Sequence, residues 1–319
     1  MKRFAHKCQR IAICFYGQYR AGDYLADYFQ QIADAAGCTV DFFCSSKRIA
    51  TYEFSKSAEA QGKNAAEYVD ASDLESKLWR KWRAKSVNII PDSVDATFKE
   101  RDCPRNGIFY SMSDSIRLKT EYENANHFVY DLVLLTRYDV LLSPGNMLNY
   151  LRRWYNDTGL VEFEQTMGYP LYNNWLMVQP LYTKDWGTWG LQDIVVVGSS
   201  YSMDALATEL QFIMYGNLEQ FASKSPIVHT MCGHTSLLTA ARSAGLCCTA
   251  KYPFVDIRTD KLTYDESVPR DKRKPAIEFS LLRDTWDLDK LTAECPVDSH
   301  KAVRFYTRQW IQDRIKIKL

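Results

Sequence analysis

One continuous apolar stretch constrains the fold of this chain more than any other feature. Residues 130–136 read YDLVLLT, and the four residues 132–135 are all aliphatic. A strand that is apolar on both faces must be covered on both sides, as the central strands of parallel sheets are. The sequence therefore predicts an α/β protein in which helices flank a mostly parallel sheet.

The segments that precede this stretch alternate between predicted strands and a predicted helix. Residues 10–16 (RIAICFY) form a β-rich run that Gly17 closes, residues 24–36 have helical spacing, and residues 39–44 again resemble a strand. A strand, a helix and a strand in close succession indicate a parallel βαβ unit. Further strands are expected at residues 87–90 and 194–197, and further helices at residues 108–126, 203–215 and 235–244.

Composition excludes several classes of protein. The chain has 319 residues, 46% of them hydrophobic, and 40 Lys+Arg balance 39 Asp+Glu. The hydrophobic content argues against a disordered chain. The balanced charge argues against a protein that mainly coats nucleic acid. No apolar run approaches the roughly 20 residues of a membrane span, and no secretory signal is visible at the start. The nine cysteines form no Cys-x-x-Cys pair, so we expect reduced thiols and a cytoplasmic protein.

Two groups of polar residues follow predicted strands. Ligands of open α/β sheets bind beyond the carboxyl ends of the strands, so the ends at Gly17, Cys44 and Thr136 should line one cleft. Gly17 permits a sharp turn, and Arg20 offers a fork of donors that suits a phosphate or a carboxylate. An ordinary turn with a solvated arginine is the alternative.

The second group directly follows the apolar strand. Asp139 is suited to hold a divalent cation through oxygen, and Arg137 is suited to neutralise a diphosphate. A salt bridge that caps the strand is an equally open interpretation.

An aromatic stretch lies between the two halves of the chain. Trp186 and Trp189 precede Asp193, and flat rings next to carboxylates suit the apolar faces and hydroxyl rims of sugars. Buried core aromatics are the alternative. Asp193 is the candidate general base for an inverting transfer to a hydroxyl group, whereas a retaining transfer would leave that deprotonation to the donor phosphate.

The order of these motifs resembles a known family. Residues 10–20, the FYSM segment at 109–112 and the strand with its charged end at 130–139 resemble glycosyltransferases of the GT-A kind. The nearest likeness is to capsule and lipopolysaccharide-type transferases of bacteria and of large DNA viruses or phages. Residues 190–204 and 233–245 continue the likeness, which is diffuse and depends on the order of the motifs.

This resemblance implies a site and a cofactor. Arg137 stands where the family's Asp-x-Asp motif has its first acid, so Asp139 either binds Mn²⁺ or Mg²⁺ with water and phosphate, or Arg137 replaces the cation. His300 is a further candidate metal ligand, and His234 stands where relatives often have Glu. Arg137 and Asp193 are the implied catalytic residues, and Trp186, Trp189 and Asp193 the implied acceptor contacts. The implied contacts of the nucleotide-sugar are Tyr16, Gly17, Gln18, Tyr19, Arg20, Ser45, Ser46, Lys47, Arg117, Arg137 and Asp139.

The resemblance also divides the chain. Residues 1–255 form the GT-A-like catalytic domain, with a nucleotide-sugar half at about 10–145 and an acceptor half at about 146–255, and residues 256–319 form an extension with a basic amphipathic helix. The expected function is transfer of a sugar from a nucleotide-sugar to a hydroxyl acceptor, most simply a glycan, in the cytoplasm, or in the host cytoplasm if the source is viral.

Three alternatives to this function stay open. Two basic aromatic segments, residues 79–85 and 301–319, are suited to stack on bases or to lie on anionic lipid, or are simply solvated helix faces. They allow a peripheral membrane contact, and they also allow a viral or phage enzyme that glycosylates a hydroxymethylated DNA base. A nucleotidyltransferase and a non-catalytic carbohydrate-binding protein are the alternatives from other classes.

Overall fold

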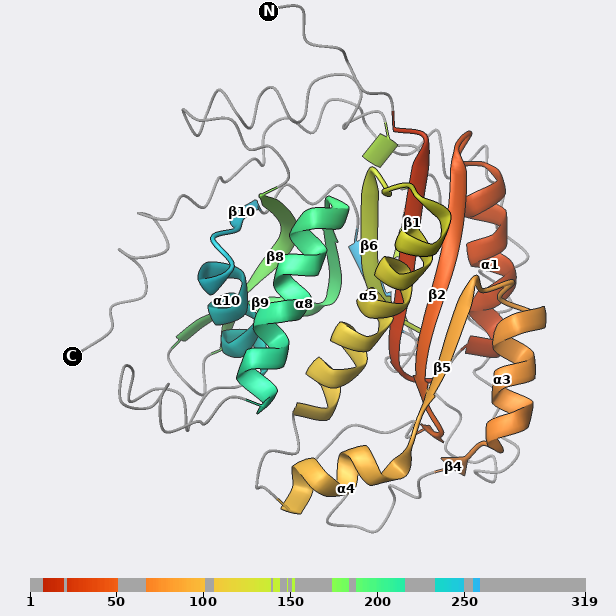
Figure 1. Cartoon of the computed structure of the whole chain (residues 1–319), viewed down its shortest axis with the longest axis horizontal. Helices are drawn as coiled ribbons and strands as arrows, with labels where there is room; N and C mark the ends of the chain where they lie inside the picture. The colour runs from red at the N-terminus through yellow and green to blue at the C-terminus, as the bar shows by residue number, and fades with distance from the viewer. Residues whose placement is uncertain are drawn as a thin grey trace, which may run out of the picture.

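The fold is built on one seven-stranded sheet with the strand order β10-β8-β9-β6-β1-β2-β5 (Figure 1). The computed structural model describes residues 8–19, 22–50, 67–100, 106–138, 140–143, 148, 151–152, 174–183, 188–215, 233–249 and 255–258. Six of the strands run in the same direction, and β9 is antiparallel to both of its neighbours. The strands are β1 (Arg10–Gln18), β2 (Thr39–Lys47), β5 (Ser86–Ile90), β6 (Leu132–Arg137), β8 (Trp175–Thr183), β9 (Thr188–Gly198) and β10 (Cys247–Thr249).

Helices cover both faces of this sheet (Figure 1). The helices α1 (Gly22–Asp34) and α3 (Ala71–Arg80) pack on one face. The opposite face is covered by α5 (Asn106–Asn126), α8 (Ser200–Tyr215) and α10 (Gly233–Ser243), while α4 (Asp92–Glu100) follows β5. Two short antiparallel pairs complete the described elements, β3 (Ile49–Ala50) with β4 (Glu67–Tyr68) and β7 (Val140–Ser143) with β11 (Val255–Arg258).

Alternate residues of each central strand feed two hydrophobic cores. Along β1, Ile13 and Phe15 enter the α1-side core, whereas Ala12 and Cys14 enter the α5-side core. The side chains of β6 from Leu132 to Leu135 are all fully buried. This burial explains the aliphatic stretch in the sequence and confirms the prediction of an α/β sheet that is flanked by helices.

Two strands extend further than the sequence indicated. The turn expected at Gly17 does not end β1, which continues to Gln18 with Gly17 at a φ of +94°. The parallel pairing also carries β2 past Cys44 to Lys47. Gly17 therefore allows an unusual backbone conformation within the strand, and the last residues of both strands belong to the sheet rather than to loops.

One of the two tryptophans in a predicted ligand-binding segment is part of the core. Within residues 79–85, Trp82 is fully buried, and its ring packs against Phe15 with 4.5 Å between the centroids. Only Trp79 of the two indoles is exposed. Trp82 therefore cannot stack on a base or enter a lipid surface, and this correction removes half of the aromatic surface proposed there. The other segment, residues 301–319, lies outside the described residues.

Two further findings bear on the sequence-based expectations. In the described part of the chain, no helix is both long enough and apolar enough to cross a membrane. Cys14 and Cys44 are free thiols in the core, as expected from their apolar surroundings. In α5, Met112 and Ile116 are buried as predicted, but Ile108 is exposed because it lies on the outer side of the first helical turn.

Candidate functional site

The carboxyl ends of β1, β2 and β6 lie side by side along the border of the sheet where the parallel strands end, which is the carboxyl edge. Parallel pairing sets Gln18 beside Lys47, and it sets Tyr16 beside Arg137. An amide and two cationic side chains thus follow one another across three adjacent strands. The prediction that these strand ends converge is confirmed, and their groups are of the kind that bind phosphate.

Lys47 is held against the beginning of a helix. Its ammonium lies 2.5 Å from Asp95 Oδ1 of α4, and 12% of its side chain is exposed. A Cβ atom at Gly107, in the first turn of α5, would lie 2.3 Å from Asp95 Oδ1 and 2.8 Å from Lys47 Nζ. Gly107 therefore lies directly against this ion pair, which places the amino end of α5, with its positive dipole, at the same edge of the sheet.

A polar network beneath Lys47 connects the sheet to α5. Ser45 donates a 2.6 Å hydrogen bond to Asp114 Oδ2, and Asn88 donates to the same oxygen at 2.7 Å. The other carboxylate oxygen of Asp114 lies 2.7 Å from Arg117 Nη2, and Arg117 also pairs with Glu121. Arg117 keeps 44% of its side chain exposed. Ser45 is therefore buried within this network, whereas Arg117 reaches solvent beside it.

The tyrosines of the predicted donor site are buried. Tyr16 is 2% exposed and Tyr19 is 3% exposed. Trp82 Nε1 donates a 3.2 Å hydrogen bond to the Tyr19 hydroxyl, and the Tyr19 ring packs edge-on against Tyr138. Tyr138 is itself fully buried, and burial raises its pKa well above the ordinary value. These rings support the end of β1 from within, and their contact with a donor stays a prediction, as does that of the buried Ser46.

Asp193 pairs with a histidine near the same edge. Val195 of β9 is opposite Thr136 of β6, so two further residues along this register place Asp193 level with Tyr138. The Asp193 carboxylate lies 3.7 Å from His234 Nδ1. The same nitrogen lies 3.0 Å from the Leu191 carbonyl oxygen. About a quarter of the His234 side chain is exposed, at 26%, against 17% for Asp193.

The Leu191 contact defines the tautomer of His234. A carbonyl oxygen only accepts hydrogen bonds, so Nδ1 must carry the proton, and the lone pair of the neutral ring is on Nε2. Among the described residues Nε2 has no hydrogen-bond partner. No role for His234 could be predicted from the sequence, because a single histidine in a helix has no pattern that points to a carboxylate about forty residues away.

Several predicted site residues lie outside the described residues. These are Arg20, Asp139, Trp186 and His300. Trp189 belongs to β9, where its backbone pairs with Tyr182. Among the described residues, no three His, Cys, Asp or Glu side chains gather closely enough to hold a metal ion. Because Asp139 and His300 lie outside the described residues, the cation site expected there stays a prediction.

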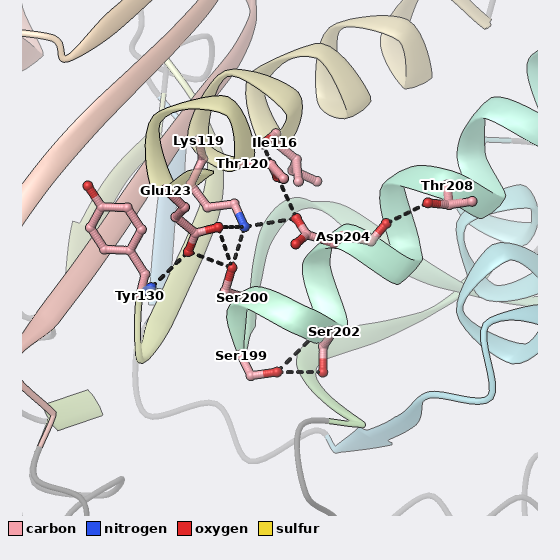
Figure 2. Close-up of polar contacts among 10 residues, drawn as sticks. All are labelled: Ile116, Lys119, Thr120, Glu123, Tyr130, Ser199, Ser200, Ser202, Asp204 and Thr208. Atoms are coloured by element: carbon pink, nitrogen blue, oxygen red, sulfur yellow. Dashed lines mark hydrogen bonds and ion pairs between the residues drawn. The ribbon is translucent and has the colours of Figure 1, made fainter. Parts of the chain in front are cut away.

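A second polar cluster, not expected from the sequence, is drawn in Figure 2. It lies at the amino edge of the sheet, where the parallel strands begin. The fully buried Lys119 lies 2.8 Å from Glu123 Oε2 and 2.8 Å from Asp204 Oδ1, and it also donates to Ser200. Tyr130 donates its backbone N–H to Glu123 at 2.7 Å. Ser200 begins α8 just after the end of β9, and Tyr130 precedes β6. This cluster fastens α8 to α5 and is remote from the candidate site.

Comparison with known proteins assigns no family. No protein-family model matches the sequence, and no curated protein matches it. Among solved structures, the chain is similar to a glycosyltransferase involved in the glycosylation of the major capsid of PBCV-1. The two chains are 9% identical, the match covers 71% of this chain and 80% of the other, and the TM-score is 0.29. A likeness of this size carries no functional argument, so the function is argued from the residues of this chain.

Proposed function

We propose that this protein is a glycosyltransferase that uses a nucleotide-sugar donor and a hydroxyl acceptor. One observation carries the proposal: Gln18, Lys47 and Arg137 lie at the carboxyl ends of three adjacent parallel strands, with the Asp193–His234 pair near the same edge. Ligands of open α/β sheets bind at this edge. The motif order that resembles GT-A enzymes includes the same strand ends, and the mixed α/β sheet is compatible with such a fold.

The cationic groups suit the diphosphate of such a donor. Lys47 supplies a point charge at the start of α5, where the helix dipole also favours an anion. Arg137 supplies a planar fork of donors that matches two phosphate oxygens at once. Both charges stabilise the nucleoside diphosphate as it leaves, because negative charge develops on it in the transition state.

The Asp193–His234 pair suits the activation of the acceptor. His234 Nε2 has the lone pair that accepts a proton from a sugar hydroxyl, and the positive charge then formed on the ring is stabilised by Asp193. In this arrangement Asp193, the candidate base from the sequence, acts through His234. A transfer with inversion of the anomeric centre needs such a base.

A divalent cation belongs to the proposal through residues that the structure does not describe. Asp139, with His300, would hold Mn²⁺ or Mg²⁺, which supplies positive charge to the diphosphate. Treatment with EDTA should then abolish activity, and Mn²⁺ or Mg²⁺ should restore it. Full activity in EDTA would instead assign that role to Arg137, with Lys47 beside it, in place of the cation.

Donor hydrolysis tests the enzyme class directly. The full chain is incubated with UDP-, GDP-, TDP- and CMP-sugars, with and without Mn²⁺, and the released nucleotide is quantified. We expect release from one donor class, and Arg137→Lys should lower its rate roughly thirtyfold, which corresponds to about 2 kcal/mol of transition-state stabilisation. Lys77→Met, which breaks a partly exposed pair with Asp73 on α3, is the matched control and should leave the rate unchanged. No release from any donor would favour a carbohydrate-binding protein.

The role of the pair is tested separately, on transfer to an acceptor. His234→Gln should lower the transfer rate about 10²-fold or more, the usual contribution of a positioned base. Asp193→Asn should lower it less, because the base itself remains. Donor binding, measured by titration with the nucleotide, should be unchanged in both variants. Retention of configuration in the product, together with an unaltered rate in His234→Gln, would assign the deprotonation to the donor phosphate.

The described residues do not favour the DNA-modifying alternative. It depended on two basic aromatic segments, and the one that the structure describes has Trp82 in the core rather than on the surface. A glycan acceptor is therefore the form of the reaction that we propose.

A further inference from the structure

A pair of cysteines lies at the amino end of the sheet, far from the candidate site. The first residues paired between β1 and β2 are Arg10 and Thr39, and Cys8 and Cys38 come just before them. Thr39 donates its N–H to the Gln9 carbonyl at 3.0 Å, which extends the pairing toward the two cysteines. Both side chains belong to the α1-side core, where Cys8 is 3% exposed and Cys38 is partly buried at its margin.

The two thiols are in direct contact. The Cys8 S–H donates a hydrogen bond to the Cys38 sulfur, and neither cysteine is in a disulfide in this structure. Neighbouring strands lie about 4.8 Å apart, and disulfides usually join Cα atoms separated by about 4.4–6.8 Å. The register places Cys38 level with Gln9, one residue from Cys8, and the contact between the two thiols brings the pair within reach of a disulfide.

The surroundings distinguish the two sulfurs. Arg152 Nη1 donates a 2.6 Å hydrogen bond to the carbonyl of Gly37, the residue before Cys38. A Cβ atom at Gly37 would lie 3.2 Å from this same nitrogen, so the guanidinium packs closely on the turn. The hydrogen bond from Cys8, assisted by the charge of Arg152, lowers the pKa of Cys38 below its ordinary value, whereas the pKa of Cys8 is raised. Cys38 is thus the nucleophilic member and Cys8 the sheltered one.

We propose that Cys8 and Cys38 form a redox pair that a hydroperoxide converts to a disulfide joining β1 to β2. The Cys38 thiolate attacks the peroxide, so that an S–O bond forms, the O–O bond breaks, and hydroxide leaves from hydrogen peroxide or an alkoxide from an organic hydroperoxide. Cys8 then attacks the Cys38 sulfur, the S–S bond forms, and the S–O bond breaks with loss of water, which carries away the Cys8 proton. The two thiols lose two electrons in total, and the peroxide gains them.

The disulfide would lie far from the proposed glycosyltransferase site. β1 is nine residues long, which separates the amino edge from the carboxyl edge by about 30 Å at roughly 3.3 Å per residue. Oxidation should therefore leave donor hydrolysis unchanged. The redox proposal does not depend on the proposed function, and either one can fail without the other.

The test is peptide mapping of the wild-type full chain. The protein is treated with hydrogen peroxide, remaining thiols are blocked with N-ethylmaleimide in denaturant, and the digest is analysed by mass spectrometry without reduction. We expect a Cys8–Cys38 cross-linked peptide, lower in mass by two hydrogens than the sum of its parts, that dithiothreitol separates. Cys44 is the internal control. Burial raises its pKa to about 12, so it should not react with peroxide and should be recovered with maleimide as its only modification. Recovery of Cys8 and Cys38 as separate blocked peptides would overturn the proposal.

Two variants establish the order of the steps. In Cys8→Ala, Cys38 loses the hydrogen bond from Cys8 but keeps the charge of Arg152 nearby, so it should react more slowly and stop at the sulfenic acid, which dimedone traps. In Cys38→Ala, Cys8 should remain a thiol under the same treatment. Dimedone labelling of Cys8 in Cys38→Ala at the wild-type rate of peroxide consumption would show that Cys8 is the attacking residue and would overturn the assignment. Circular dichroism spectra of both variants confirm that they are folded before these outcomes are compared.

Discussion

Lys119 is a charged residue whose side chain is fully buried. Its ammonium is fully buried, and its acceptors are Glu123, Asp204 and Ser200 (Figure 2). Three acceptors match the three donors of a lysine, so the charge is paired and hydrogen-bonded at once. Removing one member of such a group leaves the remaining charge uncompensated, which costs far more than the group contributes as a whole.

Lys119→Met should therefore destabilise the protein strongly. We expect the free energy of unfolding to fall by about 3–5 kcal/mol, measured by urea titration. Glu121→Gln is the matched control on the same helix, since Glu121 is 59% exposed and pairs with Arg117. It should change the free energy by less than about 1 kcal/mol. Equal effects of the two substitutions would mean that Lys119 is not held in the buried cluster.

Lys119 also shows why the candidate site could be predicted better than this cluster. Lys119 and Glu123 are spaced as an ordinary exposed i, i+4 pair, and nothing local shows that α8 covers them. Arg137, by contrast, comes two residues after an aliphatic stretch, so its place at a strand end could be inferred from the chain alone. The pairing of Asp193 with His234 is another long-range contact that no local pattern could indicate.

At the scale of elements, α3 begins with a side-chain cap. Asp70 Oδ1 accepts hydrogen bonds from the backbone N–H groups of Ser72, at 2.8 Å, and of Asp73, at 3.2 Å. These groups have no partner within the helix, so the cap satisfies them. The side-chain hydrogen bond from Ser72, together with these backbone bonds, lowers the pKa of Asp70 below its ordinary value.

The cap should make the stability of α3 depend on pH. Because the pKa of Asp70 is lower in the folded state, its contribution is present above the ordinary aspartate value of about 4 and is lost as the pH falls through the lowered value. The wild type should thus be more stable than Asp70→Ala at neutral pH, and the difference should shrink in acid. Asp70→Asn keeps a neutral cap, so its advantage over Asp70→Ala should not change with pH. Thermal unfolding of the three proteins at matched pH values measures this, and a constant difference between wild type and Asp70→Ala would contradict it.

The ends of elements were harder to infer than the elements themselves. Residues 10–16 and 39–44 are strands as predicted, but each strand continues to a later residue, Gln18 or Lys47. Glycine and serine weaken the local preference for a strand at these positions, and pairing with the neighbouring strand overrides it. The direction of β9 likewise depends on the path of the chain before it, which hydrophobic periodicity does not encode.

At the scale of the whole molecule, the two hydrophobic cores share one sheet. Phe15 projects from β1 into the α1-side core, where its ring lies 4.7 Å from that of Phe29. The next residue toward the amino end, Cys14, projects into the α5-side core with Met112. Neither face can lose its helices without exposing strands on which the other core depends, so the two cores should unfold together.

Substitutions in the two cores test this coupling. Phe15→Ala should lower the free energy of unfolding by about 3–5 kcal/mol and Met112→Ala by about 2–5 kcal/mol, through lost burial and the cavities left behind. In each variant, tryptophan fluorescence, to which Trp82 and Trp175 of the α1-side core contribute among the eight tryptophans of the chain, should follow the same transition as far-UV circular dichroism. Met112→Ala is the more informative of the two, because it perturbs the face opposite Trp82. If its far-UV signal fell at lower denaturant concentration than its fluorescence, the α5-side helices would detach first, and β1 would not couple the two cores.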